Sequence, residues 1–165
     1  MKKKKWLIVF SALVVCILII VFTIALINKK RTINDLMSQL ENAINKHEIE
    51  KIIDLYPDYC KNEALECFSQ EKLDDFYNRV IVKGNENINI QITRIINYDT
   101  SSYDDIAEQI ARDYQENVII EDCQLVRIKY HDAFGESVLQ VIKIDGNYYL
   151  YFGGHLGEPL DYFVE

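Results

Sequence analysis

Twenty-two consecutive residues, from Trp6 to Ile27, contain neither a charged residue nor a proline. At about 1.5 Å per helical residue, such a run crosses the roughly 30 Å of hydrocarbon in a bilayer. Basic residues flank it, and an indole ring at its start suits the headgroup layer. The flanking residues are Lys2, Lys3, Lys4, Lys5, Trp6, Lys29, Lys30 and Arg31. The sequence therefore predicts an N-terminal transmembrane helix, a signal-anchor, over residues 6–27.

A cleaved signal peptide is the alternative interpretation, because it also begins with basic residues and an apolar run. Its apolar region is typically about 7–15 residues long and ends in small residues near a cleavage site. The run in this chain is longer and ends Ala25-Leu26-Ile27-Asn28, which favours a retained anchor. Cys16 follows the bulky Val15, which does not suit a lipidation signal, so we interpret it as a packing or lipid-facing thiol.

Charge divides the chain into two parts of opposite sign. Residues 1–31 hold seven basic and no acidic residues, whereas the remaining 134 residues hold 11 basic and 26 acidic ones, a net charge of −15. Four lysines precede the helix and three basic residues follow it, so the positive-inside rule favours a cytoplasmic N-terminus. That orientation places the domain outside the cytoplasm. Because a domain this acidic is repelled by nucleic acid, we predict no nucleic-acid partner.

The residues after the anchor are enough for one domain, and the first half of them shows helical spacing. We expect a helix over residues 33–44 that is capped by Thr32, a second over 49–56, a loop over 58–62 and a third helical region over 64–81 that is broken at Ser69. Each of these segments places its apolar residues on one face. The sequence therefore predicts that amphipathic helices come first in the domain.

From residue 88 the apolar residues alternate, which is typical of a strand with one buried face. We expect strands from residue 88 and over 118–131, 138–144 and 148–152, with Asp145-Gly146 as a hairpin turn and a helix inserted from a Ser102–Asp105 capping box to about residue 115. The result is an α+β domain in which helices cover one face of a curled antiparallel sheet of about four strands.

Two segments carry a resemblance to a known family. The first, residues 43–53, places short helices around a polar break, and the second, residues 141–149, ends a meander in a hydrophobic–Asp–Gly–x–aromatic hairpin. They resemble small membrane-anchored extracytoplasmic proteins of Gram-positive bacteria with a cystatin-like, or nuclear transport factor 2-like, fold. His47-Glu48 stands where those proteins usually have Gly-Asp, and Tyr148 stands where a Trp is common. For many anchored members the resemblance implies a non-catalytic binding or assembly role.

The expected organisation follows from these segments. It comprises a basic tail over residues 1–5, the transmembrane helix over 6–27, a juxtamembrane linker over 28–33, the cystatin-like domain over 34–153 and a C-terminal tail over 154–165. Near the C-terminus, the apolar residues Leu160, Tyr162 and Phe163 either contact a partner or close the core of the domain itself.

A small-molecule enzyme or sensor is an alternative, because the family also contains ketosteroid isomerases and dehydratases. In such a cone-shaped domain, an imidazole base and tyrosine donors would line the mouth of the pocket. The residues at suitable positions are Tyr130, His131, Tyr149, Tyr151 and His155. No catalytic signature assigns them roles, and cross-strand packing explains the tyrosines more simply. We therefore predict a protein that is not an enzyme and uses no cofactor.

The cysteines and the charge pattern limit the remaining choices. Cys60, Cys67 and Cys123 allow at most one disulfide within the domain, and a Cys60–Cys67 bridge requires a non-helical chain between them. No Cys/His cluster has zinc-site spacing, so no metal is predicted. The sequence thus predicts a single-pass cell-membrane protein whose partners are the lipid bilayer and another envelope protein. A subunit of a secretion or conjugation apparatus is a further alternative.

Overall fold

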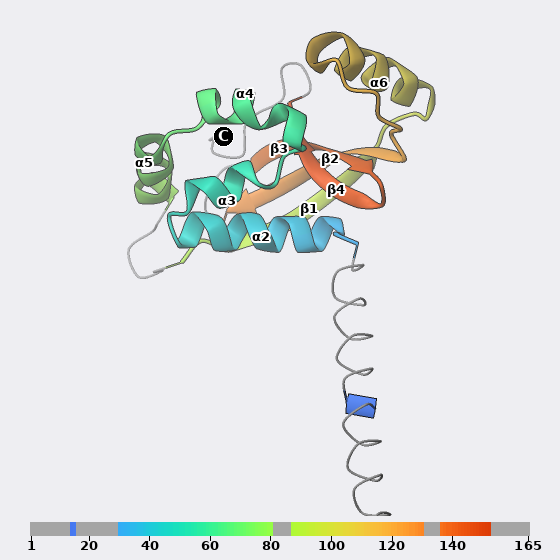
Figure 1. Ribbon diagram of the computed structural model, residues 1–165. Coiled ribbons are helices and arrows are strands. Elements are labelled where there is room, and N and C mark those ends of the chain that lie inside the picture. Colours follow the sequence, from blue (N-terminus) through green and yellow to red (C-terminus); the bar gives the residue numbers. More distant parts are fainter. Residues whose placement is uncertain (1–13, 16–29, 81–86, 131–135, 153–165) are drawn as a thin grey trace, which may run out of the picture. The chain divides into compact units, whose positions relative to one another are not determined.

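The computed structural model describes residues 14–15, 30–80, 87–130 and 136–152 (Figure 1). The chain divides into two units, residues 1–30 and 31–165, and the fold described below is that of the second unit. Apart from residues 14–15, the predicted transmembrane segment lies outside the described residues, as do both predicted tails. Within the described residues, no helix combines the length and the apolar character needed to cross a membrane.

The first helix of the domain, α2 (Ile33–Asn45), begins at the predicted cap. The hydroxyl of Thr32 accepts a hydrogen bond from the backbone N–H of Asp35 at 3.1 Å, and the Asp35 carboxylate accepts one from the backbone N–H of Thr32 at 3.1 Å. This reciprocal pair satisfies two N–H groups that a helix start leaves without partners. The buried face of α2 consists of Ile33, Leu36, Met37, Leu40, Ala43 and Ile44.

Three helices and a short 3-10 turn follow α2, and they confirm most of the predicted helical region. They are α3 (Ile49–Ile53), η1 (Asp58–Cys60), α4 (Lys61–Cys67) and α5 (Gln70–Val80). The break at Ser69 is confirmed, because its hydroxyl accepts from the N–H of Lys72 at 3.1 Å and caps α5. The predicted loop over 58–62 is wrong. Pro57 suits the start of a helical turn, and η1 leads directly into α4.

Four strands form one antiparallel sheet in the order β1-β2-β3-β4 (Figure 1), which confirms the predicted α+β class. The strands are β1 (Ile90–Asn97), β2 (Asp122–Tyr130), β3 (Glu136–Ile144) and β4 (Asn147–Tyr151). Asp145 and Gly146 form the predicted turn, with φ angles of 50° and 78° that the tight β3–β4 hairpin requires. The predicted start of β2 at residue 118 is wrong, because pairing with β3 begins only at Asp122.

The inserted helix, α6 (Ser101–Tyr114), connects β1 to β2. It ends where the sequence predicts, with Gln115 in the left-handed region at φ 58°. The predicted Ser102–Asp105 capping box is wrong, because α6 begins at Ser101 and its N-cap is Thr100, two residues before Ser102. The carboxylate of Asp99 instead accepts from the N–H of Ser101 at 3.1 Å.

Both faces of the sheet carry buried residues, so the expectation of one covered face is incomplete. On one face, Val126, Val141 and Leu150 lie in neighbouring positions of the register and are at most 1% exposed. On the other face, Cys123 and Ile142 are directly paired and are fully buried. The reason is that α6 adds apolar side chains of its own to the core, Ile106 and Ile110 among them.

Candidate functional site

The structure places the three described tyrosines of the predicted pocket on different faces of the sheet. Tyr130 is fully buried and its ring stands edge-on to Phe76, with ring centroids 5.0 Å apart. Tyr149 and Tyr151 lie on the opposite face from Tyr130 by the strand register. Tyr151 is 6% exposed, and burial raises the pKa of its hydroxyl, with further contributions from nearby acidic groups. Tyr130 therefore does not share a face of the sheet with Tyr149 and Tyr151.

Other residues singled out in the sequence cannot be placed. His131 and His155 lie outside the described residues, and so do Leu160, Tyr162 and Phe163. Among the residues that the structure does describe, no three His, Cys, Asp or Glu side chains are grouped to hold a metal ion.

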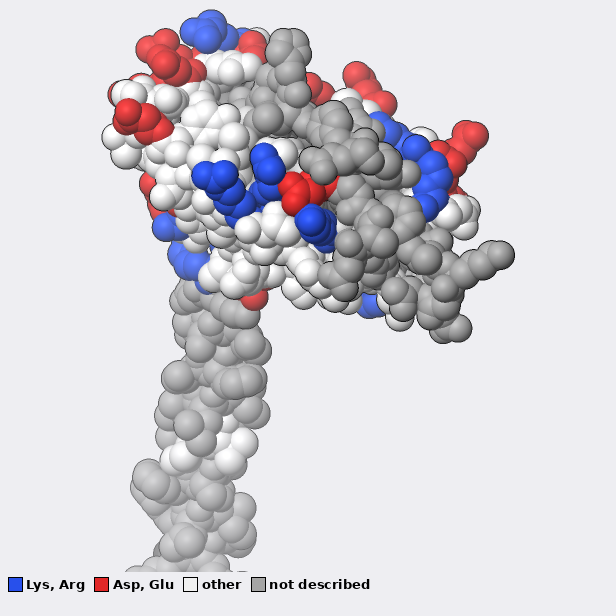
Figure 2. Space-filling view, turned by 180° about the vertical axis from the view of Figure 1, so that it is seen from behind, with Lys and Arg blue, Asp and Glu red and all other residues white. Residues whose placement is uncertain are grey.

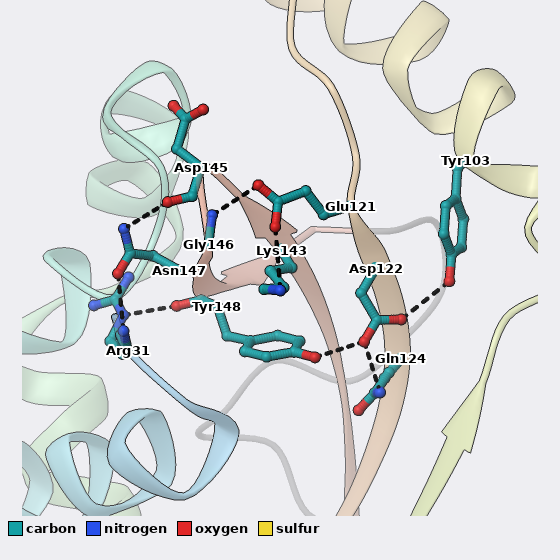
Figure 3. Close-up of polar contacts among 10 residues, drawn as sticks. All are labelled: Arg31, Tyr103, Glu121, Asp122, Gln124, Lys143, Asp145, Gly146, Asn147 and Tyr148. Atoms are coloured by element: carbon teal, nitrogen blue, oxygen red, sulfur yellow. Dashed lines mark hydrogen bonds and ion pairs between the residues drawn. The ribbon is translucent and has the colours of Figure 1, made fainter. Parts of the chain in front are cut away.

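A polar cluster centred on Asp122 joins α6 to the sheet (Figure 3). The Asp122 carboxylate accepts hydrogen bonds from the Tyr103 hydroxyl at 3.0 Å, the Tyr148 hydroxyl at 2.5 Å and the Gln124 amide at 2.8 Å. Burial, followed by the hydrogen bond to Asp122, raises the pKa of Tyr148. Both tyrosines therefore stay protonated and act as hydrogen-bond donors, and the cluster ties three separate segments together.

Arg31, predicted as an anchor flank, is bound to the β3–β4 hairpin (Figure 3). Its backbone N–H donates to the side chain of Asn147 at 2.8 Å, and its Nε donates to the carbonyl of Tyr148 at 2.6 Å. The guanidinium lies 4.4 Å from the ring centroid of Tyr149, a cation–π contact. Arg31, which the sequence placed in the juxtamembrane linker over residues 28–33, is therefore bound to the folded domain.

The cysteines of the domain are thiols rather than a disulfide. Within the described residues, Cys60, Cys67 and Cys123 form no disulfide. Helix α4 occupies the chain between Cys60 and Cys67, which excludes the bridge that the sequence left open. Burial raises the pKa of Cys60 to about 12 and also raises the pKa of Cys123. Both thiols are therefore unreactive near neutral pH, whereas Cys67 is only half-buried.

Sequence reasoning also missed the polar contact between His47 and Asp74. Nδ1 of His47 lies 2.7 Å from a carboxylate oxygen of Asp74, and the His47 ring packs on Tyr77 with centroids 4.2 Å apart. The hydrogen bond to His47 lowers the pKa of Asp74, with a smaller effect from Gln70. His47 adopts a positive φ of 56° in the turn after α2. No local sequence pattern predicts this contact, because His47 and Asp74 are 27 positions apart in the chain.

The two edge strands of the sheet differ in how their outer backbone groups are satisfied. On β4, the N–H of Tyr148 donates to the carbonyl of Arg31 at 3.0 Å, and the N–H of Leu150 donates to the carbonyl of Leu55 at 2.9 Å. The segments around Arg31 and Leu55 therefore occupy this edge much as a neighbouring strand would.

At the start of β1, two side chains of α2 occupy the outer edge. The Asn45 amide donates to the carbonyl of Ile88 at 2.8 Å and accepts from its N–H at 2.7 Å. The Glu41 carboxylate accepts from the N–H of Ile90 at 2.7 Å. N–H groups alternate in direction along a strand, so that of Ile92 also points away from β2. No hydrogen bond to it is present within the described chain.

The second half of β1 continues this open edge. The N–H of Tyr98 donates to the carbonyl of Cys123 at 3.0 Å, toward β2. By alternation, the N–H groups of Ile95 and Asn97 point away from β2. As far as the structure describes the chain, neither has a backbone partner on that side. Among the residues that the structure describes, nothing therefore pairs with the outer backbone edge of residues 92–97.

A groove and two exposed isoleucines lie along this edge. Ile95 is 45% exposed and Ile96 is 38% exposed, on opposite faces of β1. Between α2 and β1 runs an open groove of about 230 Å³, lined by Asn34, Met37, Ser38, Glu41, Ile90 and Ile92. An added strand pairs with backbone N–H and C=O groups that lack partners, and its side chains contact the apolar side chains beside them. We call residues 92–97 and this groove the β1 edge site.

Comparisons with known proteins do not assign the domain. No protein-family model, curated protein or solved structure matches the chain. The functional conclusion therefore rests on the geometry of the β1 edge site and on the sequence.

Proposed function

We propose that this chain is a single-pass membrane protein with a cystatin-like extracytoplasmic domain that acts as a non-catalytic binding or assembly module. Its partner is another envelope protein, which binds by adding an extended segment to the β1 edge site. The observation that carries this proposal is the difference between the two sheet edges. The β4 edge is occupied at Tyr148 and Leu150, whereas β1 is open from Ile92 to Asn97 within the described chain.

The physical argument is the cost of an open strand edge. Exposed edges invite pairing, and proteins usually protect them with charges, prolines, bulges or covering segments. Here the register between β1 and β2 shifts once, between Ile92 and Arg94, and Arg94 is the only charged residue in β1. The uncleaved anchor that the sequence predicts would also hold the domain at the membrane surface. A domain held beside the bilayer by a short linker is suited to contact other membrane proteins.

The location is tested with Cys67, the most accessible thiol of the described residues. We expect a maleimide that does not cross membranes to label Cys67 in intact cells, because the domain lies outside the cytoplasm. Cys60 and Cys123 should stay unlabelled until the protein is denatured. Mass spectrometry of the digested protein locates the label. Labelling of Cys67 only after the cells are broken would overturn the extracytoplasmic placement.

Binding at β1 is tested by site-specific photocrosslinking in the native membrane. A photoreactive phenylalanine analogue replaces Ile95, and a matched control replaces Glu108, whose side chain is 72% exposed on α6. We expect one discrete product from position 95 that contains a second membrane protein, and none from position 108. The same product from both positions, no product from position 95, or a product made only of two copies of this chain would contradict the proposal.

A further inference from the structure

Beside the β1 edge site, the exposed part of the sheet carries an unusual local charge. Figure 2 shows basic side chains gathered around an acidic one on the face seen from behind. By the register, Arg94, Arg127 and Lys129 project from this face of β1 and β2, and Glu136 projects from β3. Three cations and one carboxylate thus lie together in a domain whose net charge is −15 from residue 32 onward.

The single carboxylate of this patch is shared. Glu136 lies 3.1 Å from a guanidinium nitrogen of Arg127 and 3.4 Å from the ammonium of Lys129. Their side chains remain 44% and 39% exposed. Arg94 lies directly opposite Arg127 in the register of β1 and β2. Like charges in directly opposed positions repel each other, so this arrangement is unfavourable unless an anion lies between them.

Arg94 is the residue of this patch with which an acidic ligand would form an ion pair. Within the described part of the chain it makes no ion pair, whereas Arg127 already bonds Glu136. An arginine side chain binds a carboxylate through two parallel hydrogen bonds, which makes it the strongest basic partner for an acidic side chain.

We propose that the segment bound at the β1 edge site is an acidic strand with a carboxylate opposite Arg94. This inference rests on the proposed function, and it names the chemistry of the partner. Side chains directly opposite across a strand pair lie about 4.5–5.5 Å apart at Cβ, so an acidic residue of an added strand opposite Arg94 can pair with its guanidinium. Arg127 lies one strand further away, on β2, and adds to the local positive charge. Apolar residues of that strand then contact Ile95 and Ile96. The local positive charge also selects an acidic partner and disfavours pairing with the β1 edge of a second copy, which carries the same Arg94.

Methyl spectroscopy of the full-length chain tests this inference. The protein carries ¹³C-labelled isoleucine methyl groups and is studied in uncharged detergent micelles, with signals of Ile92, Ile95 and Ile96 assigned by Ile→Val variants. The probes are two blocked nine-residue peptides that alternate valine and threonine. One has two glutamates on the threonine face, and its matched control has lysines there. Low salt keeps exposed charges from being screened.

We expect the glutamate peptide to shift these methyl signals at saturating concentrations about ten-fold lower than the lysine peptide does. Arg94→Gln should reduce this preference to less than about three-fold, because it removes a charge that has no counter-ion among the described residues. Arg112→Gln is the matched control. It removes the same charge from α6, where Arg112 lies 3.6 Å from Glu108, and should leave the preference unchanged.

The outcomes separate the inference from the function on which it rests. Equal shifts by both peptides would leave the β1 edge site as a binding site and overturn its preference for acidic strands. No shift of the Ile92, Ile95 and Ile96 signals by either peptide would overturn strand addition at β1 itself. A preference that survives Arg94→Gln would also overturn the inference. Unchanged melting temperatures of both arginine variants show that the fold is intact.

Discussion

Phe76→Ala is expected to lower the free energy of unfolding of the domain by about 3–5 kcal/mol. The Phe76 ring is fully buried and stands edge-on to Tyr130, with an interplanar angle of 76°. The change removes both the apolar area and the ring–ring contact, and it leaves a cavity between α5 and β2. Such a loss is a large share of the roughly 5–15 kcal/mol that stabilises a typical domain.

Urea unfolding of the full-length protein followed by tyrosine fluorescence measures this effect. Phe76→Leu is the matched control, because it keeps most of the apolar volume and loses mainly the ring contact. Its expected loss is less than half that of Phe76→Ala. Equal losses for the two variants, or a loss below about 1 kcal/mol for Phe76→Ala, would show that α5 does not pack on the sheet through this residue.

Asp122→Ala is expected to cost about 2–3 kcal/mol of stability, the second large effect. The carboxylate accepts hydrogen bonds from the hydroxyls of Tyr103 and Tyr148, and both rings are partly buried. Removing the acceptor leaves two hydroxyls without their charged partner, and hydrogen bonds to charged groups are the stronger ones. The helix α6 then loses one of its ties to β2.

A double-mutant cycle separates the hydrogen bond from other consequences of the change. Tyr148→Phe alone removes one donor, and the Asp122→Ala, Tyr148→Phe double variant should cost less than the sum of the two single variants by about 1 kcal/mol. Asp104→Ala on α6 is a surface control with an expected change within about 0.5 kcal/mol. Strict additivity of the two single changes would show that Asp122 and Tyr148 do not interact.

Neither Phe76 nor Asp122 belongs to the β1 edge site, so we expect their effects on stability to be separable from binding at that site. Phe76 and Asp122 hold α5 and α6 in place, whereas Ile95 and Arg94 lie on an edge strand with exposed side chains. Exposed substitutions such as Arg94→Gln are therefore expected to change binding and leave the melting temperature nearly unchanged.

Much of the fold is predictable because short-range sequence patterns determine where its helices and turns begin and end. The Thr32 cap, the break at Ser69 and the Asp145-Gly146 turn each depend on residues within a few positions of each other, and all three are present. The errors have the same origin. Ser102 and Asp105 have capping-box spacing, but the N-cap of α6 is Thr100 and the Asp99 carboxylate accepts from the N–H of Ser101, because a local pattern leaves more than one start open.

The β1 edge site could not be predicted from short-range sequence patterns. The alternation of Ile90 and Ile92 indicates a strand, but it does not tell an edge strand from a central one. Whether β1 is an edge depends on the order of all four strands. The opposition of Arg94 and Arg127 likewise depends on the register between strands that α6 separates in the chain.

The order of helices and strands, the buried faces of the helices and the acidic charge of the domain follow from residue types and their local spacing. The tertiary structure alone decides which part of β1 is covered. Asn45 and Glu41 reach Ile88 and Ile90 across 43 and 49 positions of the chain and close the start of the edge. Residues 92–97 stay open within the described chain. Periodicity acts over a few residues, whereas side-chain partners this far apart are chosen only by packing.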